Sequence, residues 1–310
     1  MSTSSPESTS IGKPSFQRAL EAAHAAAGGQ DYPPGALYVV ATPIGNLADM
    51  TLRALHVLSM VDAIACEDTR HTQQLLRAVG LHRPGGELIA LHEHNEAEAA
   101  QAVIARLQEG QRVAYVSDAG TPAVSDPGAR LVAAAHAAGL RAVPLPGASS
   151  VTCALSAAGV LGSGGFVFAG FLPAKAGERG TAVDALAQEP RAVVLLEAPH
   201  RITALAEALA ALGERRVTVG RELTKQFEQI ATLPCAGWPA WLAEDPQRQR
   251  GEFALVLHPA ETSAAPGDDD RVLRLLLAEL PLKTAVKLTA EITGQPRNAL
   301  YERALQWRAD

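Results

Sequence analysis

The sequence predicts an α/β protein with a parallel-sheet domain, a second domain with a mixed sheet, and a small helical domain at the C-terminus. Short apolar runs alternate with helical segments five times between residues 36 and 158, as in parallel strands joined by helical crossovers. Glycines then cluster at residues 159–165, where we place a domain boundary. The length of 310 residues is typical of about two such domains.

The first domain is expected to contain five strand–helix units. Thr51 is suited to cap one helix, while Gly80 and Gly110 are suited to end two others. We expect strands at residues 36–41, 63–66, 88–91, 113–116 and 142–145, and helices at residues 51–60, 72–79, 96–108, 129–138 and 149–158.

The second domain is shorter and less regular, which predicts a mixed sheet. We expect strands at residues 166–169, 192–196, 217–219 and 253–257, helices at residues 181–188 and 202–212, and a polar, partly helical stretch up to Glu244. Helices are expected at residues 271–280, 282–293 and 297–307, the last two forming a pair similar to a helix-turn-helix. The predicted divisions are a disordered tail at 1–35 that includes a short helix after Phe16, domains at 36–163 and 164–260, a linker at 261–270, and a helical domain at 271–310.

The charge, the cysteine content and the apolar runs of the sequence limit the possible partners and the cellular location of the protein. The net charge is −6, which argues weakly against a nucleic-acid partner, but residues 271–310 hold seven Lys/Arg against four Asp/Glu. Three widely spaced cysteines indicate a reduced chain without a disulfide framework. No apolar run approaches the roughly 18 residues of a membrane helix, and the first residues lack the pattern of a secretory signal. We therefore expect a cytoplasmic protein without membrane contact.

Three predicted strands end in polar, glycine-containing turns, and these turns predict one binding pocket. Their sequences are TPIGN after residue 41, SDAGTPAVSDPG after residue 116, and PGASS after residue 145. The carboxyl ends of parallel strands meet at one edge of the sheet, where open α/β folds bind ligands. The first turn lacks the G-x-G-x-x-G of dinucleotide-binding folds, and the chain has no P-loop. Several strand ends, and not one glycine-rich turn, are thus expected to bind the ligand.

Eight motifs in this order resemble the signature blocks of one family. They are ATPIGNLADMTLRAL, CEDTRHTQQLL, HEHNE, VSDAGTPAVSDPGARLV, PGASSVTCALSAAG, GFLPAK, EAPHR and RELTKQFEQ. They resemble the bacterial 16S ribosomal RNA cytidine 2′-O-methyltransferases of the decoding centre, within the tetrapyrrole-methylase (class III) superfamily. The C-terminal segment KLTAEITGQPRNALYERAL resembles that family's small helical domain. The resemblance implies a two-domain fold, S-adenosylmethionine (SAM) between the domains, and a homodimer.

The expected cofactor site lies at these turns. Asp118 can hold the ammonium or ribose hydroxyls of SAM, while Gly120 and Thr121 allow close backbone approach. Residues 147–150 place backbone N–H groups at a helix start, which attracts a carboxylate. Simple turn or N-cap roles remain an alternative for Gly147 and Ser149. The full expected set is Gly45, Asp118, Gly120, Thr121, Gly147, Ala148, Ser149, Ser150, Leu196 and Glu197.

Methyl transfer to a ribose oxygen needs alignment and a group that accepts the hydroxyl proton. Glu67, Asp68 and His94 are the candidate bases, and the sequence does not rank them. The residues expected to contact RNA are Arg70, Asn95, Arg201 and Lys225. Asp68 and Arg70 can also form a surface ion pair that caps a helix, and Arg201 and Lys225 can form salt bridges between domains. His92, His94 and Glu96 could bind a metal, but methyl transfer needs none, and we expect none.

We therefore expect SAM-dependent 2′-O-methylation of a cytidine in 16S ribosomal RNA, with the RNA within the 30S subunit as partner. Two other functions remain open. One is methylation of a tetrapyrrole carbon or a diphthamide precursor on the same fold. The other is a non-catalytic role in ribosome assembly. Few aromatic residues lie near the motifs, mainly Phe171 and Phe227, which favours a ribose hydroxyl over a stacked base as the acceptor.

Overall fold

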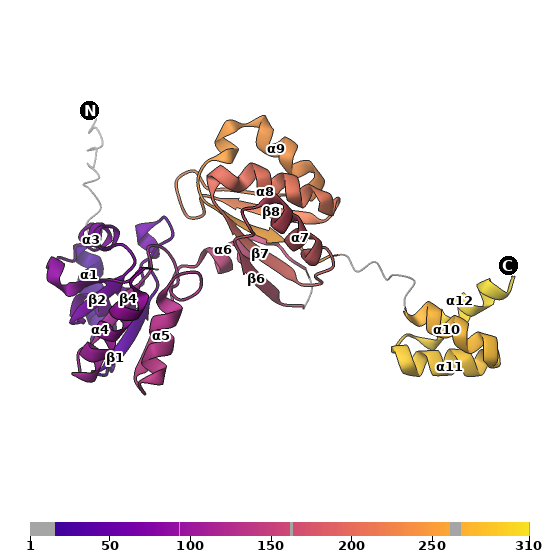
Figure 1. Cartoon of the computed structure of the whole chain (residues 1–310), viewed down its shortest axis with the longest axis horizontal. Helices are drawn as coiled ribbons and strands as arrows, with labels where there is room; N and C mark the ends of the chain where they lie inside the picture. Colours follow the sequence, from indigo (N-terminus) through magenta and orange to yellow (C-terminus); the bar gives the residue numbers. More distant parts are fainter. Residues whose placement is uncertain (1–15, 93, 162–163, 261–267, 310) are drawn as a thin grey trace, which may run out of the picture. The chain divides into compact units, whose positions relative to one another are not determined.

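The computed structural model describes residues 16–92, 94–161, 164–260 and 268–309 (Figure 1). It contains two compact units, residues 1–259 and 260–310. Most of the predicted linker, residues 261–267, lies outside the described residues, as do residues 1–15 of the predicted tail. The remaining linker residues belong to the first helix of the second unit.

A parallel sheet of five strands forms the first half of the larger unit. The strands are β1 (Ala36–Val40), β2 (Ala63–Cys66), β3 (Leu88–Ala90), β4 (Val113–Val116) and β5 (Arg141–Leu145), in the spatial order β3-β2-β4-β1-β5. Alternate residues of each strand face opposite sides of the sheet. Tyr38 of β1 therefore packs in the core on one face of the sheet, while Leu37 packs in the core on the other face. The five predicted strands and the parallel sheet are confirmed.

Helices cover both faces of this sheet, as its apolar strands require. They are α1 (Gln17–Ala27), α2 (Leu52–Met60), α3 (Thr69–Ala78), α4 (Glu96–Gln108) and α5 (Gly128–Ala137). The position of α1 corrects one prediction. We expected the helix after Phe16 to be part of a disordered tail, but Ala23 and Ala27 are buried and α1 packs against α2. The small alanine side chains allow this close packing, which the low hydrophobicity of the segment concealed.

The second sheet is mixed, as predicted, and has one more strand than expected. It contains β6 (Phe166–Gly170), β7 (Ala192–Glu197), β8 (Arg216–Arg221), β9 (Gln229–Pro234) and β10 (Phe253–Leu257), in the order β6-β7-β10-β8-β9. Among the strand pairs that the structure describes in this sheet, only β6–β7 is parallel. The prediction that residues 220–244 form a polar, partly helical stretch was wrong for β9. This edge strand is half exposed, so it lacks the apolar run that identifies the inner strands.

Four helices pack against the second sheet. One face is covered by α7 (Ala176–Leu186), α8 (Ile202–Leu209) and α9 (Trp238–Glu244), with Trp238 fully buried. The other face is covered by α6 (Ser150–Ala158), which follows the last strand of the first sheet. Val151, Ala154 and Ala158 of α6 pack against Val194 and Val256 of the second sheet. The start of α6 therefore brings the end of β5 to the second sheet.

The described residues of the smaller unit form three helices, α10 (Asp268–Glu279), α11 (Leu282–Thr293) and α12 (Arg297–Ala309), close to the predicted bounds. Leu273, Val286, Leu300 and Ala304 form its core. Gly294 ends α11 with a φ of 73°, a left-handed conformation that glycine adopts without a steric penalty. Pro296 then precedes α12, which produces the predicted short turn between the two helices.

Candidate functional site

The carboxyl edge of the first sheet brings the three predicted turns together. Thr42 and Gly120 form an antiparallel bridge, with N–H···O distances of 2.9 and 3.1 Å. Gly147 lies so close to β1 that a Cβ added to it would approach the Ala41 Cβ to 2.7 Å. The hydroxyl of Thr121 donates to the carbonyl of Ala148 over 2.9 Å. The turns after β1, β4 and β5 are therefore joined to one another, as the sequence predicts.

Two adjacent cavities lie at this edge. One of about 220 Å³ is lined by Asp118, Gly120, Thr121, Ser149, Ser150 and Leu196, among others. The second, of about 370 Å³, is lined by Leu196 and Glu197 together with apolar side chains such as Ile44 and Phe171. Ala119, Ser150 and Leu196 line both cavities. Seven of the ten predicted cofactor residues thus line this space, and Gly45, Gly147 and Ala148 instead support its walls.

Acidic side chains at the ends of β2 and β4 hold each other through backbone groups. The N–H of Asp118 donates to Oε1 of Glu67 over 3.0 Å, and the N–H of Asp68 donates to Oδ1 of Asp118 over 3.3 Å. These two hydrogen bonds fix the spacing of neighbouring strand ends. They also place carboxylate groups from two different turns beside the same cavity.

Asp68 is the N-cap of α3 and accepts hydrogen bonds from the N–H groups of Arg70 and His71. Its carboxylate also pairs with the Arg70 guanidinium at 3.1 Å. The hydrogen bonds from Arg70 lower the pKa of Asp68 to about 2. Asp68 and Arg70 thus form the helix-capping surface pair that the sequence left open as an alternative.

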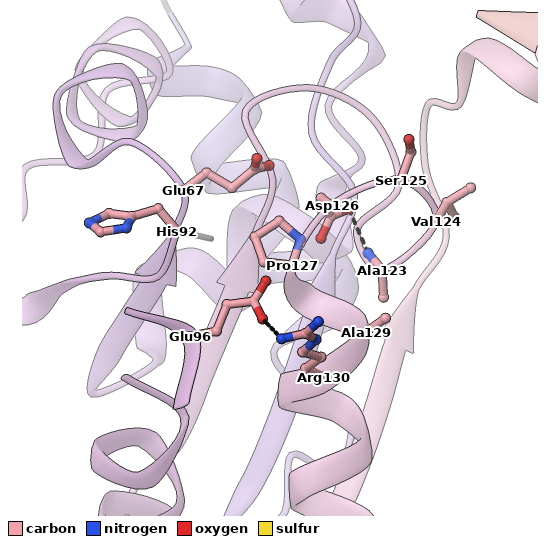
Figure 2. Close-up of a pocket in the computed structure, with 10 residues that line it drawn as sticks. All are labelled: Glu67, His92, Glu96, Ala123, Val124, Ser125, Asp126, Pro127, Ala129 and Arg130. Atoms are coloured by element: carbon pink, nitrogen blue, oxygen red, sulfur yellow. Dashed lines mark hydrogen bonds and ion pairs between the residues drawn. The ribbon is translucent and has the colours of Figure 1, made fainter. Parts of the chain in front are cut away.

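A third cavity, of about 560 Å³, lies between the start of α4 and the loop that leads into α5 (Figure 2). Glu67 and Asp126 line both this cavity and the one that contains Asp118. Figure 2 shows Glu67 extending toward the loop that carries Asp126, with Glu96 and Arg130 paired beside it at 2.6 Å. Asp126 and Arg130 were not singled out as site residues, although both follow the SDAGTP turn closely.

Asp126 anchors this loop. It accepts hydrogen bonds from the buried Tyr115 hydroxyl at 2.8 Å, from the Ala123 N–H at 2.7 Å and from the Gly128 N–H at 2.8 Å. Burial, followed by the charge of Asp126, raises the pKa of Tyr115, so its hydroxyl stays a donor. Ala123 has a φ of 65°, an unfavourable conformation for a residue with a side chain. The three hydrogen bonds offset this strain.

The segment before α4 has a structural role. Asn95 accepts a hydrogen bond from the His92 N–H at 2.8 Å and donates to the Ala90 carbonyl at 2.9 Å. Its side chain amide therefore shapes the turn after β3. His94 is exposed, lies 6.0 Å from the His92 ring, and lines none of the three cavities. The structure does not bring His94 to the strand ends that carry Glu67 and Asp118.

Glu197 is a buried carboxylate at the end of β7. Its side chain is 1% exposed, and Oε1 pairs with the Arg201 guanidinium at 3.1 Å. Arg201 also donates to the Leu172 carbonyl. Oε2 of Glu197 has no hydrogen-bond partner among the described residues. A buried carboxylate oxygen without a partner is costly, so this atom is suited to accept a hydrogen bond from a ligand in the adjoining cavity.

Lys225 is held by two carboxylates. Its ammonium lies 2.8 Å from Glu222 and 2.8 Å from Glu252. Burial alone would lower the pKa of Lys225, but the hydrogen bonds to these two carboxylates raise it overall. A Cβ added at Gly45 would approach the Lys225 Cγ to 2.3 Å, so the absence of a side chain at Gly45 makes room for the lysine stem.

The described residues lack two further kinds of feature. No group of three or more His, Cys, Asp or Glu side chains there could hold a metal ion. None of the helices in the same described ranges is long and apolar enough to cross a membrane.

Comparison with known proteins identifies the family. The model of Tetrapyrrole (Corrin/Porphyrin) Methylases matches residues 36–236, and that of the RsmI C-terminal HTH domain matches residues 263–308. The chain is 50% identical to the Ribosomal RNA small subunit methyltransferase I of Escherichia coli O157:H7, over 88% of this chain and 95% of the relative. It is also 50% identical to the protein of the same name from Pseudomonas aeruginosa, over 88% of this chain and 97% of the relative.

Solved structures show the same fold at low identity. Diphthine synthase matches with a TM-score of 0.55 and 14% identity, over 72% of this chain and 90% of that one. The methyltransferase CobJ matches with a TM-score of 0.54 and 19% identity, over 72% of this chain and 94% of that one. Together with the two family models and the long matches to relatives, these findings show that the chain belongs to the Tetrapyrrole (Corrin/Porphyrin) Methylases and is a SAM-dependent methyltransferase.

Proposed function

We propose that the chain transfers a methyl group from SAM to the 2′ oxygen of a cytidine ribose in 16S ribosomal RNA, within the decoding centre of the 30S subunit. The observation that carries the proposal is the 50% identity to proteins named Ribosomal RNA small subunit methyltransferase I, which extends over nearly their whole length. Residues 271–310, which hold seven Lys/Arg against four Asp/Glu, match this substrate class, since phosphate contacts depend on Lys and Arg. We also propose that the enzyme acts as a cytoplasmic homodimer.

The two adjacent cavities fit SAM chemically. Asp118 is suited to bind the ammonium or the ribose hydroxyls, and the backbone N–H groups at the start of α6 are suited to bind the carboxylate. Oε2 of Glu197 offers an acceptor for a further N–H or O–H donor. Bound SAM supplies the electrophilic methyl group. The chain contributes alignment of the two reactants and exclusion of water.

Glu67 is the base that we propose for the ribose hydroxyl proton. Glu67 lines the cavity that contains Asp118, where we propose that SAM binds, and it also lines the neighbouring 560 Å³ cavity. It is therefore adjacent to both cavities. Asp68 is a poorer base, because hydrogen bonds from Arg70 hold its pKa at about 2. His94 lines neither cavity. Arg70, Arg201 and Lys225 remain proposed RNA contacts, although each is already paired with a carboxylate.

Binding experiments test the cofactor site. Calorimetry should show SAM binding that persists in EDTA and weakens about 10- to 100-fold in Asp118→Ala, as expected for the loss of a hydrogen bond to a charged group. Asp184→Ala, which removes an exposed carboxylate from α7, is the matched control. Unchanged affinity in Asp118→Ala would remove Asp118 from the site.

Product analysis tests the reaction. The protein is incubated with methyl-labelled SAM and, separately, with 30S subunits, free 16S RNA or a tetrapyrrole. We expect label in the RNA, recovered after complete alkaline hydrolysis as one alkali-resistant dinucleotide, because a 2′-O-methyl group removes the nucleophile for backbone cleavage. Label in ordinary mononucleotides would place the methyl group on a base. Label in the tetrapyrrole alone would overturn the ribosomal RNA substrate.

A further inference from the structure

The 560 Å³ cavity next to the proposed cofactor site has the size and the position of a substrate site. Its volume falls in the range of about 300–1,000 Å³ found for small-molecule sites. Glu67, Val124, Ser125 and Asp126 line both this cavity and the one that contains Asp118. A group bound in the larger cavity therefore lies beside the proposed site of the methyl donor.

The charged groups of this cavity include one arginine that can bind an anion. Arg130 is 81% exposed at the side chain, whereas its partner Glu96 is 13% exposed. Their ion pair joins the Arg130 Nη1 to the Glu96 Oε2. A guanidinium has five N–H donors in a planar fork, so most of its donors stay available to a second acceptor. Because the Glu96 carboxylate is mostly buried, the ion pair stays intact, and the remaining N–H donors of the exposed guanidinium are available to a phosphate.

We propose that this cavity receives the acceptor nucleotide, with the ribose against Glu67 and an adjacent phosphate bound by Arg130. The inference rests on the proposed function and extends it to a substrate-positioning residue. The acidic wall formed by Glu67 and Asp126 suits ribose hydroxyls, which donate hydrogen bonds, and Arg130 supplies the positive charge that a phosphodiester requires. Pairing with Glu96 holds the guanidinium at the rim of the cavity.

Steady-state kinetics with 30S subunits and labelled SAM test this role. Arg130→Ala should raise KM for the RNA substrate about 10-fold, while kcat stays within about two-fold and calorimetric SAM affinity is unchanged. Removal of one phosphate contact should also reduce the slope of log KM against log salt concentration by about 0.7–1. Arg141→Ala is the matched control, because Arg141 is exposed at the start of β5, the opposite edge of the sheet.

A second variant distinguishes the loss of attraction between Arg130 and a phosphate from a new repulsion between the unpaired Glu96 carboxylate and that phosphate. Arg130→Ala leaves the Glu96 carboxylate without its partner, so the double variant Arg130→Ala/Glu96→Gln is measured in parallel. The reduced salt slope should persist in the double variant if Arg130 contacts phosphate. A wild-type salt slope in either variant, or an effect equal to that of Arg141→Ala, overturns the inference while the proposed function stands. A wild-type chain that methylates no RNA overturns the proposed function and this inference together.

Discussion

At the scale of single residues, the carboxylates at the strand ends differ in what they can do. Asp68 is occupied by capping α3, and its low pKa of about 2 makes it a weak base. Asp118 and Glu67 are joined through the Asp118 N–H, which orients the Glu67 carboxyl group. The backbone contacts of each acid thus separate roles that residue type alone leaves equivalent.

Glu67→Gln should lower kcat about 10²- to 10⁴-fold, the usual contribution of a general base. The glutamine can still accept the hydrogen bond from the Asp118 N–H, so SAM affinity should change little. Asp68→Asn is the matched control, since asparagine also caps helices well, and it should keep near-wild-type kcat. Loss of kcat in Asp68→Asn with activity retained in Glu67→Gln would reverse the assignment.

At the scale of elements, the loop between β4 and α5 depends on a residue beneath it. Tyr115 of β4 is fully buried and donates to Asp126, which holds the strained Ala123 and the first helical N–H of α5. This loop forms part of the walls of two neighbouring cavities. Packing of the strand therefore supports the shape of the site.

Tyr115→Phe should lower the free energy of unfolding by about 1.5–3 kcal/mol, because it removes a hydrogen bond to a charged group. Tyr38→Phe is the matched control, since Tyr38 is equally buried and donates to the neutral Pro33 carbonyl over 2.9 Å. The Tyr38→Phe substitution should lower the free energy of unfolding by about 0.5–1.5 kcal/mol. Urea unfolding measures both variants, and equal costs would show that the Asp126 charge adds nothing.

The contact between α1 and α2 should make stability depend on pH. His56 of α2 is buried beside the rings of His24 and Tyr32, and burial followed by the charge of His24 lowers the pKa of His56. As pH falls below about 6.5, the unfolded chain therefore binds a proton that the folded chain resists, and stability decreases. Burial also lowers the pKa of His258, so this residue should likewise decrease stability as pH falls.

Urea unfolding at pH 8 and at pH 5.5 should reveal this loss, and His56→Gln should reduce it. Each protein is compared with itself at the two pH values, so an effect of the substitution on packing that does not depend on pH cancels. A His56→Gln protein with the full wild-type pH dependence would show that His56 does not contribute to it.

At the scale of the whole molecule, the predicted cofactor residues and the basic C-terminal residues lie in different units. Every predicted cofactor residue lies in the unit of residues 1–259, whereas the C-terminal unit has its own core and carries seven Lys/Arg within residues 271–310. The Arg303–Asp270 pair and the stacking of Arg274 on Trp307 fix some of its arginines in place.

A chain ending at Pro259 should bind SAM with wild-type affinity and lose methylation of RNA. The lost Lys and Arg side chains would otherwise contact phosphates, so RNA binding by the full-length chain should depend more steeply on salt concentration than RNA binding by the short chain. Filter-binding and methyl-transfer assays measure the two properties. Full-rate RNA methylation by the short chain would assign the C-terminal helices to stability or dimerisation.

The sequence by itself determined the strand–helix alternation, the parallel first sheet and the meeting of three polar turns. These features depend on local signals, namely buried apolar runs, caps and glycine turns, together with the rule that parallel strands end at one edge. The motifs also identified the family correctly. The half-exposed strand β9 and the packed helix α1 carried weak local signals, and they were not predicted correctly.

Only the tertiary structure decided which side chains meet across the turns. Asp126 with Tyr115 and Glu96 with Arg130 are 11 and 34 positions apart, and neither pair follows from spacing in the sequence. The same holds for α6, which leaves the first sheet to cover the second. Such contacts depend on how elements pack in three dimensions, where the free energy of a side chain is set by neighbours that the local sequence does not contain.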